Sequence, residues 1–231
     1  MGREFELRKE VVLPVSPEQV WQAVATAQGQ AAWFMSTEDI APADAEVWDP
    51  PKHLVIRTPQ AEDGSFHAFE YLIEGREGTA VLRFVHSGMS GEAWPDEYVD
   101  MTSMGWNTYL HSLREYLVHF PGRPALYVEA EAPKSSVDSG AWDRLVAELG
   151  VAAVGDKASI PLPGLPSQDG VVDIIEESYV GIRTADSLVR FHGRARIGMP
   201  IAVGHHVYTP IDTDAYGKAW AAWLGSVYQE V

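Results

Sequence analysis

Cysteine is absent from the 231 residues of this chain. Its absence excludes disulfide bonds, zinc sites built on thiolates and thiol nucleophiles. Long apolar runs are also absent, since no stretch approaches the roughly 18 apolar residues that a membrane-spanning helix needs. The N-terminus, MGREFELRKE, lacks the apolar core that a signal peptide carries. We therefore expect a soluble, cytoplasmic protein with no membrane partner.

Positive charge is scarce. The chain has 17 Lys and Arg residues against 33 Asp and Glu residues, a formal net charge of −16 at pH 7. Both halves share this imbalance. Residues 1–122 contain 8 Lys and Arg residues against 19 Asp and Glu residues, and residues 123–231 contain 9 against 14. An acidic surface repels phosphate backbones and anionic lipids, and no stripe rich in Lys or Arg interrupts it. We expect no nucleic-acid partner.

Apolar residues, by contrast, make up 46% of the chain, enough for one large packed core or two small ones. The clearest local signal is the stretch VLPVSPEQVWQAVA. In it Ser16 is placed to cap a helix, Pro17 suits the first helical position and Gln19 completes a capping box. These signals predict a helix near 16–28, and a second short helix, QAAWFM, after Gly29.

Alternating apolar and polar residues predict strands on both sides of this segment. The first covers 3–13, before the helix. Two more cover 67–74 and 80–86, and the turn GREG between them predicts a hairpin.

A long amphipathic helix is predicted over 96–120, because apolar side chains recur there at helical spacing. The sequence FPGRP ends it, since proline and glycine do not continue a helix. We place the domain boundary at this point, with one domain at 1–122 and a second at 123–231.

The second half repeats the order of elements. A strand at 125–132 precedes a helix that begins near Ser139, several strands follow, and a last helix is predicted near 213–229. Aromatic residues of the two long helices match at a constant offset, as Trp106 and Trp220 do. Chance likeness between amphipathic helices is the alternative, but the shared order of elements favours a tandem duplication with a diverged second copy.

Five motifs of the first half occur in the order found in a known family. They are VSPEQVWQAVA, GQAAWF, VWDPPKHL, GTAVLRFVHSGM and DMTSMGWNTYLHSLREYLVHFPGR. Over about residues 4–123 the chain resembles bacterial START-like proteins of the SRPBCC superfamily, in the group similar to the activator of heat-shock protein 90 ATPase. The resemblance implies an α+β helix-grip fold, in which a curved antiparallel sheet surrounds a long C-terminal helix and often encloses an apolar cavity.

The sequence departs from the family pattern before the motif VWDPP. Only thirteen residues, MSTEDIAPADAEV, separate Phe34 from Trp48, where relatives usually carry a glycine-rich pair of strands. A shortened sheet implies a smaller or more open cavity and an exposed sheet edge. We expect the second half to cover that edge and to form one two-lobed body with the first.

Aromatic residues of the first half are the candidates for a ligand site. A pocket lined by aromatic rings and few polar groups suits a planar, apolar molecule. A well-filled core uses the same residue types, and the sequence leaves both interpretations open. The candidate ligand-binding residues are Trp33, Trp48, Phe69, Tyr71, Phe84, His86, Trp106, Tyr109 and Leu110.

His86 is the candidate polar group of this site. It shares a strand face with Leu82 and Phe84, so it should point towards the long helix. There it could bond a ligand or act as a base. No carboxylate stands at an obvious partner position, which favours a structural histidine bonded to the backbone or to the helix. His67 is a weaker candidate, because it lies nearer a turn.

No metal or cofactor is expected. His205 and His206 are adjacent on a predicted strand, so their side chains point to opposite faces and do not readily chelate one ion. The acidic residues from Glu92 to Asp100 are explained by the favourable position of negative charge at a helix N-terminus. The sequence contains no nucleophile elbow, phosphate-binding loop or dinucleotide-binding fingerprint.

Enzymatic function therefore lacks positive support. The leading hypothesis is a non-enzymatic protein that binds a small hydrophobic or aromatic molecule between the long helix and the sheet. The resemblance implies two alternatives. One is a co-chaperone-like module that contacts a protein partner, as an ATPase activator does. The other is a START-like cyclase or hydrolase, for which His86 is the only candidate polar group.

Overall fold

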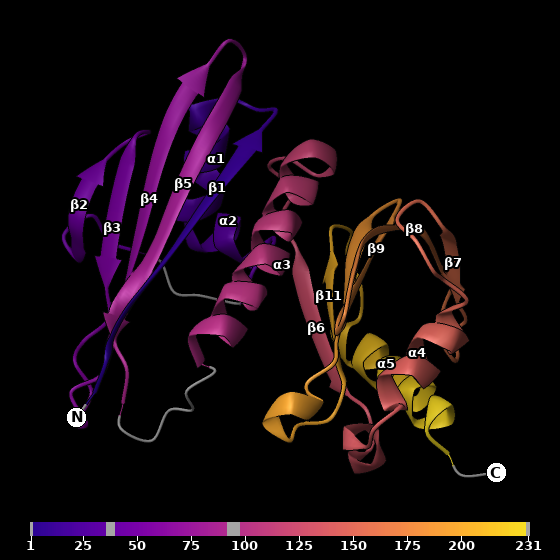
Figure 1. Ribbon diagram of the computed structural model, residues 1–231. Helices are drawn as coiled ribbons and strands as arrows, with labels where there is room; N and C mark the ends of the chain where they lie inside the picture. Colours follow the sequence, from indigo (N-terminus) through magenta and orange to yellow (C-terminus); the bar gives the residue numbers. More distant parts are fainter. Residues whose placement is uncertain (1, 36–39, 92–97, 230–231) are drawn as a thin grey trace. The chain divides into compact units, whose positions relative to one another are not determined.

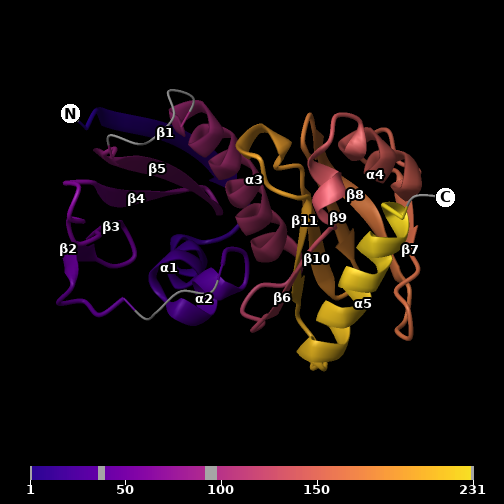
Figure 2. The same ribbon diagram turned by 90° about the horizontal axis from the view of Figure 1, so that it is seen from below.

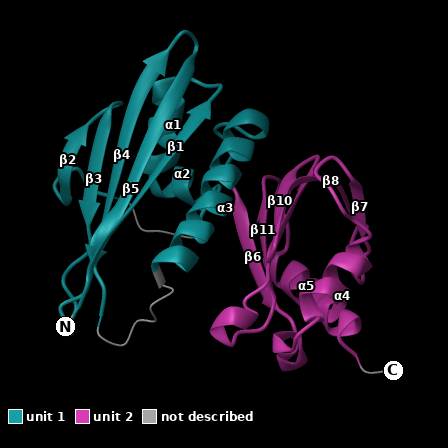
Figure 3. Ribbon diagram, in the orientation of Figure 1, with its two compact units in different colours: residues 1–124 teal, residues 125–231 magenta. Residues whose placement is uncertain are grey.

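The computed structural model describes the whole chain except residues 1, 36–39, 92–97 and 230–231. The acidic residues Glu92, Asp96 and Glu97 therefore lie outside the described residues. The chain divides into two compact units, Met1–Pro124 and Ala125–Val231 (Figure 3). Each unit is an α+β body with one antiparallel sheet.

The described residues of unit 1 form five strands and three helices, whose arrangement can be followed in Figure 1. Its strands form one antiparallel sheet in the order β1-β5-β4-β3-β2. Figure 2 shows α1, α2 and α3 on one side of this sheet. The elements are β1 (Glu4–Leu13), α1 (Pro17–Ala25), α2 (Ala27–Ala31), β2 (Ala45–Asp49), β3 (His53–Arg57), β4 (Phe66–Arg76), β5 (Thr79–Met89) and α3 (Tyr98–His119).

The start of α1 follows the predicted signals. The backbone N–H of Gln19 donates to the side chain of Ser16, and the Gln19 side chain accepts from the backbone N–H of Ser16, which completes the capping box. The predicted single helix near 16–28 is wrong, because Thr26 has extended dihedral angles and ends α1. The Thr26 hydroxyl accepts from Gly29 N–H and starts α2, so the second helix begins earlier than predicted.

The hairpin β4–β5 carries the inward-facing side chains of the site. Its turn places Glu77 at φ 39° and Gly78 at φ 84°, the left-handed conformations that a tight two-residue hairpin turn requires. Strand alternation then sets His86 opposite Phe69 in the ladder. α3 presents an apolar stripe that includes the buried Trp106 and Leu110.

In the part of unit 2 that the structure describes, six strands lie in the order β6-β11-β10-β9-β8-β7, with a layer formed by α4 and α5. Its apolar core is formed by side chains of these two helices and of the strands. The main elements are β6 (Leu126–Glu131), α4 (Ala141–Leu149), β7 (Lys157–Ile160), β8 (Gln168–Glu176), β9 (Tyr179–Thr184), β10 (Ser187–His192), β11 (Ala202–Val207) and α5 (Thr213–Val227). Two short 3-10 helices, η1 (Lys134–Val137) and η2 (Ala195–Ile197), lie in connections.

The two units share one topology. In each, the first strand pairs with the last strand of the sheet, a short helix follows the first strand, and the longest helix follows the last strand. The predicted α+β helix-grip fold, duplicated in tandem, is confirmed. The expectation that the second half covers an edge of the first sheet stays a prediction. Within the described residues, no helix combines the length and the apolar character needed to cross a membrane.

Candidate functional site

An aromatic cluster fills the space between α3 and the hairpin β4–β5 in unit 1. It is centred on Trp106, whose ring centroid lies 4.2 Å from that of Phe84 and 5.9 Å from those of Phe69 and Tyr109. Phe34, three residues after the end of the short helix α2, completes it, because its ring stacks on Trp106 at 5.6 Å with an interplanar angle of 8°. We define the aromatic cluster as Phe34, His67, Phe69, Phe84, His86, Trp106 and Tyr109.

The cluster has a buried floor and a half-buried rim. Trp106, Phe84 and His86 are buried. The rings that surround them keep intermediate exposure, so part of their surface reaches solvent; they are Phe34, His67, Phe69 and Tyr109. Offset and edge-to-face contacts between such rings favour flat apolar partners.

His86 links the helix to the sheet through hydrogen bonds. The indole Nε1–H of Trp106 donates to His86 Nδ1 at 3.0 Å. The other ring nitrogen, Nε2, lies 2.9 Å from His67 Nδ1. Burial lowers the pKa of His86 to about 4, with a smaller contribution from His67. Burial also lowers the pKa of His67, so both rings are neutral at pH 7.

The predicted site residues do not all come together. Phe69, Phe84, His86, Trp106 and Tyr109 meet in the cluster. Tyr71 and Leu110 are buried beside it, and the Tyr71 ring lies 5.1 Å from that of Phe84.

Trp33 and Trp48 lie outside the cluster. The Trp33 indole donates to the carbonyl of Ala23 at 2.9 Å, and its ring touches only the edge of the cluster through Phe34. Trp48 belongs to β2 and packs edge-to-face on Trp21 at 5.2 Å.

Sequence reasoning did not assign Phe34 and ranked His67 low. Phe34 follows the last residues of α2, and no local pattern indicates that its ring reaches α3. His67 stands on the same strand face as Phe69, a period of two that is visible in the sequence and places both rings towards the helix.

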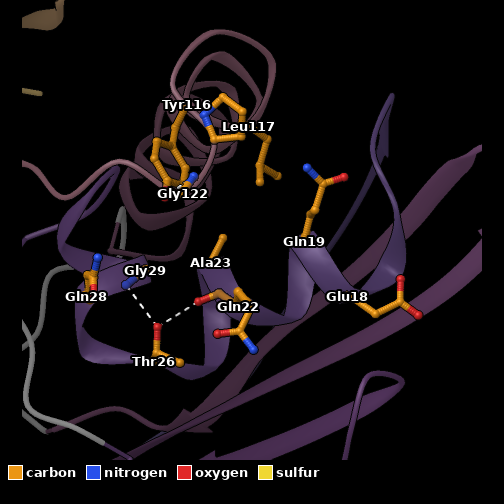
Figure 4. A pocket seen from close by; sticks show the side chains of 11 residues that line it. Glu18, Gln19, Gln22, Ala23, Thr26, Gln28, Gly29, Tyr116, Leu117 and Gly122 are labelled. Atoms are coloured by element: carbon orange, nitrogen blue, oxygen red, sulfur yellow. Dashed lines mark hydrogen bonds between the residues drawn. The ribbon is translucent and has the colours of Figure 1, made fainter.

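A pocket of about 470 Å³ lies on another side of unit 1, between α1, α2 and the C-terminal end of α3 (Figure 4). Gln19 reaches towards it from α1, with Tyr116 and Leu117 on the opposite wall (Figure 4). The described residues that line it include three glutamines and one carboxylate, from Glu18, and no cationic side chain. A shallower depression of about 400 Å³ is lined by Glu4, Phe5, Glu6, Phe66, Ser87 and Gly88.

Unit 2 repeats the tryptophan–histidine contact of the cluster. The indole of Trp220, on α5, donates to Nδ1 of His205, on β11, at 3.1 Å. His205 is fully buried, and its Nε2 has no hydrogen-bond partner among the described residues. Burial lowers the pKa of His205 to about 3, with a smaller contribution from the neighbouring histidine.

The adjacent His206 contacts the ring of Tyr127 at 4.7 Å instead of α5, as the alternation of strand side chains predicts. In the part of the chain that the structure describes, no group of three or more His, Asp or Glu side chains is arranged to hold a metal ion.

No family model matches the sequence, and no curated protein matches it. Several solved structures are similar to it. The Aha1 dimer from Colwellia psychrerythraea is 20% identical over 49% of this chain and 96% of its own, with a TM-score of 0.38. DynU16, from the dynemicin biosynthetic locus, is 16% identical over 96% of this chain and 97% of its own, with a TM-score of 0.39.

Protein MLL2253 from Mesorhizobium loti is 17% identical over 50% of this chain and 98% of its own, with a TM-score of 0.41. The similar structures include an Aha1 protein. The resemblance is one of fold.

Proposed function

We propose that unit 1 binds a small, flat, apolar or aromatic molecule at the half-buried rim of the aromatic cluster, without catalysing a reaction on it. The observation that supports this is the exposure of Phe34, Phe69 and Tyr109 around a buried tryptophan. A core that served only stability would gain from burying these rings completely, since burial of apolar surface is favourable.

The energetics suit a ligand of two or three fused rings. An aromatic pair contributes about 0.5–1.5 kcal/mol beyond the burial of its area. Contact with two or three rim rings, together with the apolar area removed from water, is sufficient for micromolar affinity, which corresponds to about 8 kcal/mol.

The state of His86 argues against catalysis at this site. Among the described residues its hydrogen bonds go to Trp106 and His67, and no carboxylate orients it. A general base works best when its pKa lies near the operating pH. A histidine whose pKa is lowered to about 4 is a weak base at neutral pH.

Binding of fluorene, a planar hydrocarbon, tests the proposal by equilibrium dialysis. We compare the wild-type protein with Phe69→Leu and with Phe66→Leu, which make the same change on one strand. The two residues are three positions apart on β4, so their side chains face opposite sides of the sheet. On the side away from the aromatic cluster, Phe66 packs under Arg57.

We expect saturable binding to the wild type and a dissociation constant raised about 3- to 10-fold in Phe69→Leu, with Phe66→Leu unchanged. Native mass spectrometry of the purified protein complements the titration, because a co-purified apolar compound would identify the natural ligand class. The proposal fails if no saturable binding is found, or if the two variants behave alike.

A further inference from the structure

One histidine in the interior of unit 2 has a ring nitrogen without a hydrogen-bond partner. His205 is completely buried on β11, and its Nε2 bonds to no other group among the described residues. The indole of Trp220 has an N–H donor and no acceptor, so His205 Nδ1, 3.1 Å from it, accepts and carries no proton. Burial lowers the pKa of His205 to about 3, so the imidazole is neutral at pH 7 and its proton is on Nε2. His205 therefore has a buried N–H donor that lacks an acceptor.

Unit 1 contains the same contact and shows which neighbour faces the second ring nitrogen. The indole of Trp106 donates to Nδ1 of His86, whose Nε2 lies 2.9 Å from His67 Nδ1. His86 pairs with Phe69 across the ladder between β5 and β4, and His67 precedes Phe69 by two residues. Both histidines lie on the same face of the sheet, because the side chains of a strand alternate with a period of two. The Nε2 atom of His86 thus faces the residue two positions before its ladder partner.

In unit 2 a serine stands at that position. His205 pairs with Val189 on β10, and Ser187 precedes Val189 by two residues. Because a tryptophan of the long helix holds the ring of His205 through Nδ1, as in unit 1, the Nε2–H of His205 is directed towards Ser187. Ser187 is completely buried too, but its side chain lacks an imidazole ring and is not hydrogen-bonded to His205.

The hydroxyl oxygen of Ser187 is a buried acceptor. The Thr184 hydroxyl donates its only proton to Asp186 Oδ1 at 3.1 Å, since a carboxylate accepts and does not donate. The hydroxyls of Thr184 and Ser187 lie 2.7 Å apart, so the proton between them comes from Ser187. In the part of unit 2 that the structure describes, no group donates to Ser187 Oγ in return. A buried donor on β11 thus faces a buried acceptor on β10, and the two are not bonded to each other.

We propose that unit 2 binds one ordered water molecule in its interior, where the water accepts from His205 Nε2–H and donates to Ser187 Oγ. Buried waters in proteins typically make about three hydrogen bonds to polar groups that otherwise lack partners. A buried donor without an acceptor costs free energy, and the water removes this cost. In unit 1 the imidazole of His67 stands where unit 2 holds the water. The site is separate from the proposed ligand site of unit 1.

A high-resolution crystal structure of the full chain tests the site. We expect one peak of electron density about 2.7–3.2 Å from both His205 Nε2 and Ser187 Oγ. Unit 1 is the control in the same map, because His67 already faces His86 and no peak is expected between their rings. A map without the peak in unit 2, or with a protein atom bonded to His205 Nε2, overturns the proposal.

Two serine variants test the bridge. Ser187→Ala removes the oxygen that receives the proton of the water, and we expect the peak to lose most of its occupancy. Ser136→Ala is the matched control, a buried serine of unit 2 that accepts from the backbone N–H of Ile201, and it should keep the peak. A peak at full occupancy in Ser187→Ala, or equal loss in both variants, overturns the role of Ser187.

NMR of the wild-type protein gives a second test that needs neither crystals nor variants. The Hε2 proton of His205 should show a cross-peak to water, and its sign in a rotating-frame experiment should be that of direct dipolar contact. A cross-peak with the sign of chemical exchange, or no cross-peak, contradicts the proposal.

Discussion

Three histidines, His86, His192 and His205, are kept neutral at pH 7 by burial, and this makes the stability of the fold depend on pH. The ordinary pKa of 6.5 falls to about 4 for His86 and His192 and to about 3 for His205. Desolvation is the main cause at each position, because an apolar environment disfavours the charged imidazolium. For His86, the hydrogen bond from Trp106 adds to this, since it occupies the nitrogen that would take the proton.

We predict that acidification destabilises the wild type more than a His86→Gln variant. Between pH 6.5 and pH 4 the unfolded histidine is protonated and the folded His86 is not, so the unfolded state binds more protons and stability falls as the pH falls. The limiting slope for one such group is about 1.4 kcal/mol per pH unit. Urea unfolding of both proteins at pH 7, 6 and 5 measures how the free energy of unfolding of each depends on pH.

The stability difference between the two proteins isolates the contribution of His86 from that of the carboxylates and of the net charge, which both proteins share. Stability curves that run parallel from pH 7 to pH 5 would show that His86 takes up its proton equally in the folded and unfolded states.

Elements of secondary structure were predictable where the signal is local. The capping box of Ser16, the turn after Arg76 and the apolar stripe of α3 each depend on residues within a few positions of one another, and each appears in the structure. Thr26 shows the limit, because a hydroxyl that caps a second helix interrupts a stretch whose apolar spacing continues. Propensity alone does not distinguish the two outcomes.

Contacts across elements were predictable only where strand or helix periodicity gives a direction. The periodicity placed Phe84, His86 and Trp106 on facing surfaces, and the structure brings them together. It gives no direction for Phe34, which follows a helix, or for the contact between Trp48 on the edge strand β2 and Trp21 on α1. Such contacts depend on tertiary packing between elements that are far apart in the sequence, and the pattern of neighbouring residues does not predict it.

A glycine in the middle strand of unit 2 allows a buried ion pair to cross the sheet. The side chains of Arg190 on β10 and Asp173 on β8 are both buried, and Arg190 Nη1 lies 3.0 Å from Asp173 Oδ2, with β9 between the two strands. A Cβ atom on Gly181 would lie 2.6 Å from Asp173 Oδ1 and 2.7 Å from Arg190 Nη1. Both distances are too short for a side chain.

We predict that Gly181→Ala destabilises the protein by about 1–3 kcal/mol, because the added methyl group separates the charges or distorts β9. Gly225→Ala is the matched control. It lies in α5 with open space around its Cβ position, so we expect it to be neutral or to stabilise by about 0.5 kcal/mol. Thermal and urea unfolding compare the two, and equal effects would refute the role of Gly181.

At the scale of the whole molecule, the chain consists of two units that each have the parts of an independent domain. Unit 2 has its own apolar core, with fully buried Leu145, Ile182, Phe191 and Trp220 contributed by helices and strands alike. A unit of about 100 residues with one continuous core falls in the size range of domains that fold alone.

We predict that residues 125–231, produced as a separate polypeptide, unfold cooperatively in urea. Coincident transitions by circular dichroism and by tryptophan fluorescence would satisfy the test for two-state behaviour. Residues 1–124 provide the comparison. A fragment without a cooperative transition would show that unit 2 depends on the rest of the chain for its fold.

Each unit contains its own hydrogen bond from a tryptophan to a histidine, and this bond limits which substitutions the protein tolerates. Replacing only His86 or only His205 removes the acceptor of a buried indole N–H. A buried donor without an acceptor lowers the stability by about 1–3 kcal/mol. That is a large fraction of the 5–15 kcal/mol that holds a typical domain together. Losing the tryptophan–histidine pair has a small effect on stability only when both residues are replaced together. Single substitutions of either residue are therefore disfavoured. We therefore expect descendants of this duplication to keep the tryptophan and the histidine in each half long after the surrounding residues have drifted apart.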